Sequence, residues 1–171
     1  MSAVLKNEEY KWYPVYTSPR AEKSAFKALI NKGIESYLPL HRQLKQWSDR
    51  KKWVEEPLIK SYLFVRIKEN DQTEVLMTKG ISRFIFFSGK IAPIPDRQID
   101  ELKMLTASSI HLQITAEGLQ PGEKVTVKAG PLKGLSGEII SFRSQKVLVV
   151  RLDSLGYSII INVATTLLNR A

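Results

Sequence analysis

The sequence predicts an α+β fold, in which a sheet-and-helix domain is followed by a small β-barrel. Three observations predict this. Residues 10–106 alternate between strand-like and helix-like segments, which favours helices layered on a sheet. Residues 119–171 consist of short β-rich runs separated by turn residues, which is typical of a small barrel. Residues 107–118 are polar and lack a strong period, so we expect a linker there.

The first expected elements are a strand and a helix. Residues 12–17 (WYPVYT) are aromatic and β-branched, which favours a strand. Pro14 indicates an edge position or a bulge, because proline cannot donate to a β-ladder. Ser18 and Pro19 predict the start of a helix, since serine caps and proline already has helical φ. Apolar residues then recur at helical spacing up to Gly33: Ala25, Phe26, Leu29 and Ile30.

Further elements complete the first domain. Residues 34–40 predict a second strand, and residues 59–67, apolar on both faces, predict a central one. The stretch 41–53 has five lysines and arginines against one aspartate and no clean period, so it predicts a hairpin tip or a mobile loop. Residues 72–78 fit one or two helical turns, and 81–87 fit a strand. Asp96 can cap a final helix with apolar positions at Ile99, Leu102 and Leu105.

The tail is strand-like throughout. Four β-rich runs are expected to form strands, at 124–127, 138–142, 146–152 and 158–163. Gly130 and Gly134 allow backbone angles that other residues avoid, and Gly137 lets two strands approach closely. A module of about fifty residues is stable only if nearly every strand pairs with a neighbour.

Composition narrows the function classes. The formal net charge of +9 makes a polyanion a plausible neighbour, although a solvated basic surface explains it equally. There are no cysteines, and no apolar run approaches the length of a membrane-spanning helix. His41 and His111 have no metal-ligand spacing, and the glycines match no nucleotide-binding motif. We therefore expect no catalytic site, no metal, no cofactor and no membrane contact.

Two segments carry a resemblance to a known family. Residues 121–139 (PGEKVTVKAGPLKGLSGEI) resemble the KOW motif of an SH3-like β-barrel. In the front half, WYPVYTSPRAE, EPLIKSYLFVRI and GISRFIFFSGKIAPIPD resemble the amino-terminal domain of the NusG family of transcription elongation and antitermination factors. The two domains stand in the order that the family has, and the resemblance covers the chain from about residue 10 onward. It implies a cytoplasmic, monomeric adaptor that works on RNA polymerase.

The chain departs from the general factor in two places. The family's phenylalanine-proline-glycine before the central tyrosine is replaced by Ile59, Lys60 and Ser61. The basic segment with Trp47 and Trp53 is more similar to the specialised paralogues, RfaH and the UpxY type. Resemblance to the UpxY type implies action on polysaccharide-synthesis operons.

The resemblance also implies a set of binding residues. An aromatic and apolar patch would pack on the clamp helices of the polymerase largest subunit: Tyr16, Ile59, Tyr62 and Phe84. Rigid rings on a sheet suit an amphipathic partner helix. Ordinary core packing is the alternative for each of them.

Two basic groups are candidate nucleic-acid contacts. Arg20, Lys23 and Lys27 fall on one helical stripe, with Lys79 nearby, and the resemblance places this helix near upstream or non-template DNA. Basic residues interleaved with tryptophans can hold a flexible strand, here exposed non-template DNA or the nascent transcript, which makes Arg50, Lys51 and Lys52 the second group. The alternatives are a solvated helix face and a charged loop anchored by its own tryptophans.

The barrel is expected to bind another protein. The resemblance implies a small-subunit ribosomal protein or a termination factor as its partner. Lys128, Lys133 and the apolar residues near Ile139 and Phe142 are the candidate surface. The main alternative function is a ribosome-associated or RNA-binding KOW protein, because such barrels also occur in ribosomal proteins.

Overall fold

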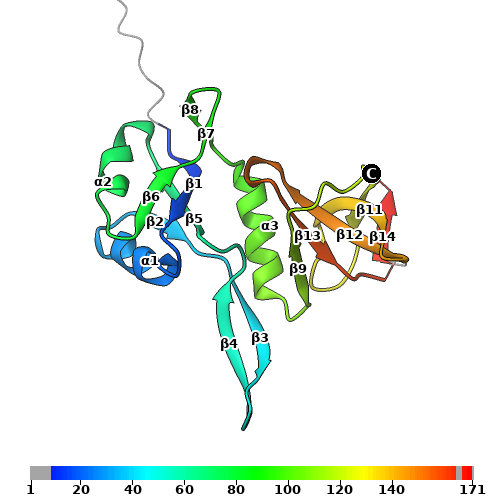
Figure 1. Ribbon diagram of the computed structural model, residues 1–171. Helices are drawn as coiled ribbons and strands as arrows, with labels where there is room; N and C mark the ends of the chain where they lie inside the picture. The colour runs from blue at the N-terminus through cyan, green and yellow to red at the C-terminus, as the bar shows by residue number, and fades with distance from the viewer. Residues whose placement is uncertain (1–8, 165–166, 171) are drawn as a thin grey trace, which may run out of the picture. The chain divides into compact units, whose positions relative to one another are not determined.

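The computed structural model describes residues 9–164 and 167–170 and divides into two compact units, with the boundary between Asp100 and Glu101 (Figure 1). This confirms the predicted α+β class. None of the helices in these described ranges is long and apolar enough to cross a membrane. The predicted domain bounds, 10–106 and 119–171, remain predictions.

The first unit is built on a four-stranded sheet with the strand order β2-β5-β1-β6. The sheet strands are β1 (Lys11–Thr17), β2 (Glu35–Tyr37), β5 (Tyr62–Ile67) and β6 (Ile81–Phe84). Two hairpins extend from it, β3 (Leu40–Gln46) with β4 (Lys51–Pro57), and β7 (Phe86–Phe87) with β8 (Lys90–Ile91). The helices are α1 (Glu22–Asn31), η1 (Glu69–Asp71), α2 (Gln72–Leu76) and α3 (Asp96–Ala107), and the boundary between the units falls within α3.

One face of this sheet forms the core of the first unit. Val15 of β1, Val65 of β5 and Phe84 of β6 pack with Leu29 of α1 and Val75 of α2. The predicted central strand is confirmed as β5, which lies between β2 and β1. It begins later than predicted, at Tyr62, because residues 58–61 form a turn instead.

The start of the first helix and the role of Pro14 differ from what the sequence predicted. The first helix begins at Glu22 and not at Ser18, because Arg20 adopts a left-handed backbone with φ of 63° that interrupts a helix. Of the two alternatives that Pro14 indicated, the edge strand is excluded, since β1 pairs with β5 on one side and with β6 on the other. The register with β6 is regular only up to Tyr16 and shifts between Tyr16 and Thr17.

The second unit is a six-stranded antiparallel sheet with the order β14-β10-β11-β12-β13-β9. Its strands are β9 (Leu112–Thr115), β10 (Glu123–Val127), β11 (Ser136–Phe142), β12 (Gln145–Leu152), β13 (Tyr157–Ile161) and β14 (Leu168–Arg170), with η2 (Asp153–Leu155) between β12 and β13. The segment 107–118, predicted as a linker, contains β9, which pairs with β13. The alternation of β9 covers only four residues, LQIT, within a polar stretch, so the sequence did not predict a strand there.

The glycines of the tail have the roles predicted for them. Gly130 and Gly134 have φ values of 88° and 92°, a region that favours glycine. A Cβ atom at Gly137 would lie 2.6 Å from the carbonyl oxygen of Val149 on the neighbouring strand. Close approach of β11 to β12 therefore depends on this glycine.

Candidate partner-binding surfaces

The aromatic surface of the first unit centres on Tyr16 and Tyr62. These residues stand opposite each other in the β1–β5 register, and their rings meet edge to face at 5.1 Å. Both are half-buried, and the guanidinium of Arg83 lies 5.4 Å from the centre of the Tyr16 ring. Strand alternation puts all three side chains on the face opposite the α1–α2 core. We call Tyr16, Tyr62 and Arg83 the tyrosine surface.

The two other residues predicted for this surface do not belong to it. Phe84 is 1% exposed and packs edge to face on Tyr13 at 6.3 Å, within the core on the opposite side of the sheet. Its neighbour Arg83 holds the outward position, because adjacent strand residues face opposite ways. Ile59 is 2% exposed and precedes β5. Core packing, the alternative reading, is therefore the correct one for Phe84 and Ile59.

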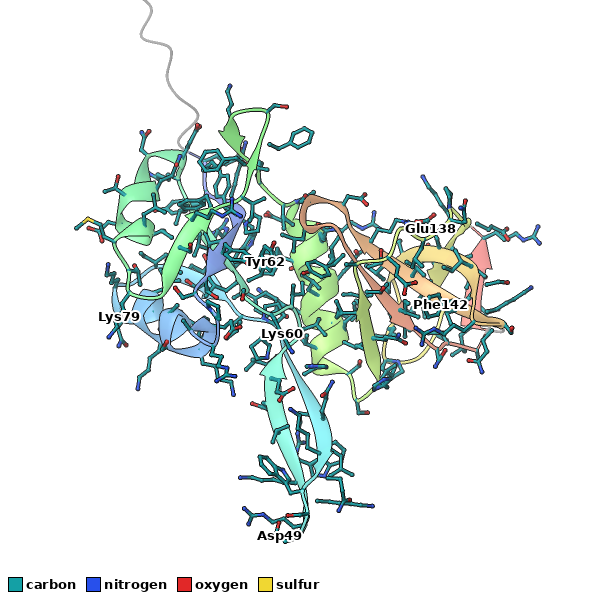
Figure 2. The ribbon with its side chains drawn as sticks, viewed as in Figure 1. Asp49, Lys60, Tyr62, Lys79, Glu138 and Phe142 are labelled. Carbon is teal, nitrogen blue, oxygen red and sulfur yellow. The ribbon has the colours of Figure 1, made fainter. Side chains whose placement is uncertain are left out.

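The predicted basic stripe lies on and beside α1. Lys23 and Lys27 are exposed and one helical turn apart, and the Nζ of Lys23 donates to the carbonyl oxygen of Glu55 at 2.7 Å. Arg20 is exposed but precedes the helix, so it is not part of the helical stripe. Lys79 is exposed (Figure 2), and the carbonyl of the next residue, Gly80, accepts a hydrogen bond from the amide of Ser18 at 2.9 Å, which joins its segment to the one that holds Arg20.

The basic tryptophan segment is a regular β-hairpin, the first of the two alternatives left open by its sequence. In β3–β4, Leu44 pairs with Trp53 and Gln46 with Lys51, and Asp49 lies at the tip (Figure 2). Trp47 and Trp53 are 53% and 58% exposed, so neither anchors the hairpin in a core. Trp53 shares a face with its partner Leu44, and Trp47, an odd number of residues after Leu44, lies on the opposite face of the hairpin.

Each face of the hairpin combines an indole with cations. The guanidinium of Arg42 lies 5.3 Å from the Trp53 ring, and Lys51 shares that face. Lys52 lies on the other face with Lys45, which is paired with Glu56. The exposed rings and nearby positive charges suit a flexible polyanion with stacking bases.

A buried carboxylate that the sequence analysis missed connects α1 to the segment before Tyr62. Glu22 is 7% exposed, and its Oε1 accepts the amide of Ser61 at 2.9 Å. Ser61 has a φ of 65°, unusual for a residue other than glycine, and its carbonyl accepts the amide of Thr17 at 2.8 Å. Glu22 thus holds a strained turn in place directly before the tyrosine surface. Its signals in the sequence were an acid within a basic stripe and a serine at the family's glycine position.

A second aromatic feature was also missed. Phe86 and Phe87 of the β7–β8 hairpin are 60% and 78% exposed. The sequence predicted one strand over 81–87, but two short strands, β6 and β7, form there instead. They are separated by Ile85, whose amide donates to the carbonyl of Pro14. A run of β-forming residues such as ISRFIFF does not show where a strand leaves its sheet.

In the second unit, a half-buried ion pair ties the chain before β10 to β11 and β12. Glu138 accepts from Arg151 at 2.5 Å and from the amide of Gly122 at 3.0 Å. Burial tends to raise the pKa of Glu138, but the hydrogen bonds from Gly122 and Arg151 outweigh it and lower the pKa. Lys128 and Lys133 are exposed, and Ile139 and Phe142 are half-buried.

We expect the second unit to lose stability as the pH falls through the pKa of Glu138. The folded-state pKa lies below the ordinary value of 4.5, so the ionised carboxyl contributes stability above that value and protonation removes it at lower pH. Urea unfolding followed by circular dichroism above and below pH 4.5 measures the loss. A Glu138→Gln variant should be less sensitive to acid. Equal acid sensitivity of the two proteins would contradict the assignment.

Within the described ranges, no group of three or more histidine, aspartate or glutamate side chains could hold a metal ion. His41 and His111 lie in different units, in β3 and just before β9. The candidate sites are surfaces: the tyrosine surface, the two basic surfaces and the sheet of the second unit.

Comparisons with known proteins agree with this arrangement. The family model described as transcription termination factor NusG matches residues 10–103, more than half of the chain. A curated protein of Pseudomonas aeruginosa, the transcription termination/antitermination protein NusG, is 26% identical over 149 residues, which are 80% of this chain and 84% of that protein. A solved structure of Thermotoga maritima NusG, described as showing a domain interaction, is similar in fold. It has a TM-score of 0.56 and 17% identity, covering 95% of this chain and 97% of that chain.

Proposed function

This chain belongs to the NusG family of transcription termination factors, and from that premise we propose that its first unit binds the clamp helices of the RNA polymerase largest subunit. In this proposal it is a transcription elongation regulator with antitermination activity, and not an enzyme. The observation that carries the polymerase contact is the Tyr16–Tyr62 pair on the sheet face away from the α1–α2 core. The family match on residues 10–103 favours this function over a ribosome-associated KOW protein.

The physical basis is the rigidity of the tyrosine surface. Two rings in edge-to-face contact lose little side-chain entropy when a partner covers them. Arg83 lies over the ring of Tyr16 and adds a charge at the margin. An amphipathic helix pair offers an apolar groove for the rings and carboxylates for the guanidinium. Tighter binding to elongating than to paused polymerase would shift the equilibrium toward elongation.

We expect Tyr62→Ala to weaken polymerase binding by about 1–3 kcal/mol, the scale of an interface hot spot. The variant removes half of the ring pair but no fully buried side chain. Titration of labelled protein with purified polymerase measures the change in Kd. Tyr10→Ala is the matched control, because Tyr10 is an exposed tyrosine of the same unit outside the tyrosine surface. An unchanged Kd for folded Tyr62→Ala would remove the assignment.

We propose that two basic surfaces contact upstream or non-template DNA beside the polymerase. One comprises Arg20, Lys23, Lys27 and Lys79 around the start of α1, and the other comprises Arg50, Lys51 and Lys52 on the hairpin. Contacts of lysine and arginine with phosphates are independent of sequence and weaken with salt. The opposite-facing tryptophans of the hairpin add sites on which exposed bases can stack.

We expect alanine at Arg50, Lys51 and Lys52 together to reduce crosslinking of the hairpin to non-template DNA severalfold. Each lost phosphate contact lowers the salt dependence of binding by about one unit in a log–log plot. A photocrosslinker at Asp49, next to these residues, measures the contact in an assembled elongation complex. Alanine at Lys128 and Lys133, both exposed in the second unit, is the control for loss of charge. Crosslinking as strong as that of the parent protein would contradict a DNA contact here.

We further propose that the second unit recruits another factor, either a small-subunit ribosomal protein or a termination factor. Attachment to a polymerase-bound unit raises its effective concentration near the transcript. The Ile59-Lys60-Ser61 replacement and the basic tryptophan hairpin support a specialised paralogue of the UpxY or RfaH type. Polysaccharide-synthesis operons are the corresponding targets.

A further inference from the structure

We propose that the second unit binds an unpaired nucleobase of a single-stranded nucleic acid in a pocket on one face of its sheet. The pocket has a volume of about 110 Å³ and a floor formed by Val147 and Ile160. Its walls are polar or aromatic: Phe142, Arg143, Gln145, Gln113, Asn162 and His111. This inference goes beyond the proposed function, which assigns nucleic-acid contacts to the first unit alone.

The register of the sheet shows that the pocket is a built feature of four adjacent strands. Phe142 pairs with Gln145 across β11 and β12, and Ile160 pairs with Gln113 across β13 and β9. Val147 follows Gln145 by two residues and therefore shares its face. Phe142 also packs on the apolar cluster of Val147 and Ile160, which fixes the position of its ring.

Phe142 and Arg143 together form a stacking surface. The guanidinium carbon of Arg143 lies 4.9 Å from the centre of the Phe142 ring. Arg143 and Ser144 have φ values of 49° and 66°, which form the tight turn that returns the chain from β11 to β12. Aromatic rings and guanidinium planes are the groups on which proteins stack unpaired bases.

Three amides stand where the edge of such a base would lie. The side chains of Gln113, Gln145 and Asn162 each offer a carbonyl acceptor and an NH₂ donor. None of the three has a side-chain hydrogen bond to another residue of the described ranges. An apolar side chain of a protein partner would desolvate these amides without replacing their hydrogen bonds with water, which is costly. A nucleobase edge provides both donors and acceptors.

The charge around the pocket suits a phosphate backbone. No carboxylate lines it, and the exposed Arg143 at the β11–β12 turn is part of its wall. Glu138, on the same strand as Phe142, is neutralised by its ion pair with Arg151. The combination of one stacking surface, three amides and a guanidinium favours a nucleobase over a peptide.

The test measures binding of short labelled single-stranded RNA and DNA to the full-length protein by fluorescence anisotropy. Alanine at Arg50, Lys51 and Lys52 is present in every variant, so that the hairpin does not dominate the signal. The pocket variant is Gln113→Ala with Asn162→Ala, which leaves Phe142 and the apolar floor intact. The matched control is Gln120→Ala with Asn169→Ala, which removes the same two side-chain types from exposed positions outside the pocket.

The pocket variant should bind single strands about tenfold more weakly or worse, and the control variant should bind as before. NMR shifts on titration should map to Gln113, Asn162 and residues 142–145. Weaker binding of the pocket variant to RNA alone, to DNA alone or to both supports the pocket, and it identifies which nucleic acid supplies the base. Equal binding of duplex and single strand, equal loss in both variants, or shifts elsewhere would overturn it. Capture of a peptide at the pocket with no oligonucleotide binding would overturn it as well. None of these outcomes depends on polymerase binding.

Discussion

Gly122→Ala is expected to unfold the second unit or to lower its free energy of unfolding by about 3 kcal/mol, a typical cost of adding atoms to a well-packed core. A Cβ atom at this position would lie 2.1 Å from the carbonyl oxygen of Ile139 and 2.5 Å from a methyl carbon of Ile140. The carbonyl cannot move away freely, because Ile139 pairs with Glu123 in the β10–β11 ladder and with Leu148 in β12. The substitution also disturbs the amide that donates to Glu138.

The positions of the tryptophans allow unfolding of the two units to be measured separately. All three tryptophans, Trp12, Trp47 and Trp53, belong to the first unit. Tryptophan fluorescence therefore follows unfolding of the first unit, while circular dichroism follows both. Gly118→Ala is the matched control, since a Cβ there meets nothing within 4 Å. If Gly122→Ala and Gly118→Ala had the same unfolding midpoints, the close approach would not limit the fold.

Glu22→Ala is expected to destabilise the first unit by about 1.5–3 kcal/mol, the worth of a hydrogen bond to a charged group. The substitution removes the carboxylate that accepts the Ser61 amide. The turn at Ser61, where φ is positive and unfavourable for serine, then loses the hydrogen bond that holds it. Polymerase affinity should fall with it, because Ser61 directly precedes Tyr62. Urea unfolding monitored by tryptophan fluorescence measures the first effect, and polymerase titration measures the second.

A second substitution distinguishes this role from a general loss of packing. Ser61→Gly keeps the amide donor but removes the strain of positive φ. We expect Glu22→Ala to cost less in the Ser61→Gly background than in the parent protein, which a double-mutant cycle detects. Glu55→Ala, a nearby exposed carboxylate in β4, is the control for lost charge. Strict additivity of the two changes would show that Glu22 does not act on this turn.

Local patterns predicted many of the elements. The apolar spacing of Ile99, Leu102 and Leu105 predicted α3, and all three residues are fully buried. Patterns were weakest where a residue's conformation depends on a distant partner. Residues 112–115 (LQIT) alternate too briefly to stand out within the polar stretch 107–118, and they form β9 by pairing with β13.

The candidate surfaces show the same limit. The segment ISRF has apolar residues only at its two ends, and this pattern does not indicate which side chain faces the helices. The register Val15↔Phe84 and the packing of α1 put Phe84 inside and leave Arg83 beside Tyr16. Likewise, the two tryptophans of the hairpin were visible in the sequence, but only the pairing of Leu44 with Trp53 puts them on opposite faces.

By itself the sequence determined the fold class, the succession of a mixed unit and a β-rich unit, the turn glycines and the excess of positive charge. These properties follow from short-range periodicity, backbone freedom and composition. The tertiary structure decided which aromatics are accessible, that Glu22 holds the turn at Ser61, and that Phe142, Gln113 and Asn162 line one pocket. Those relations join residues far apart in the chain, and only the pairing of strands and the packing of helices bring them together.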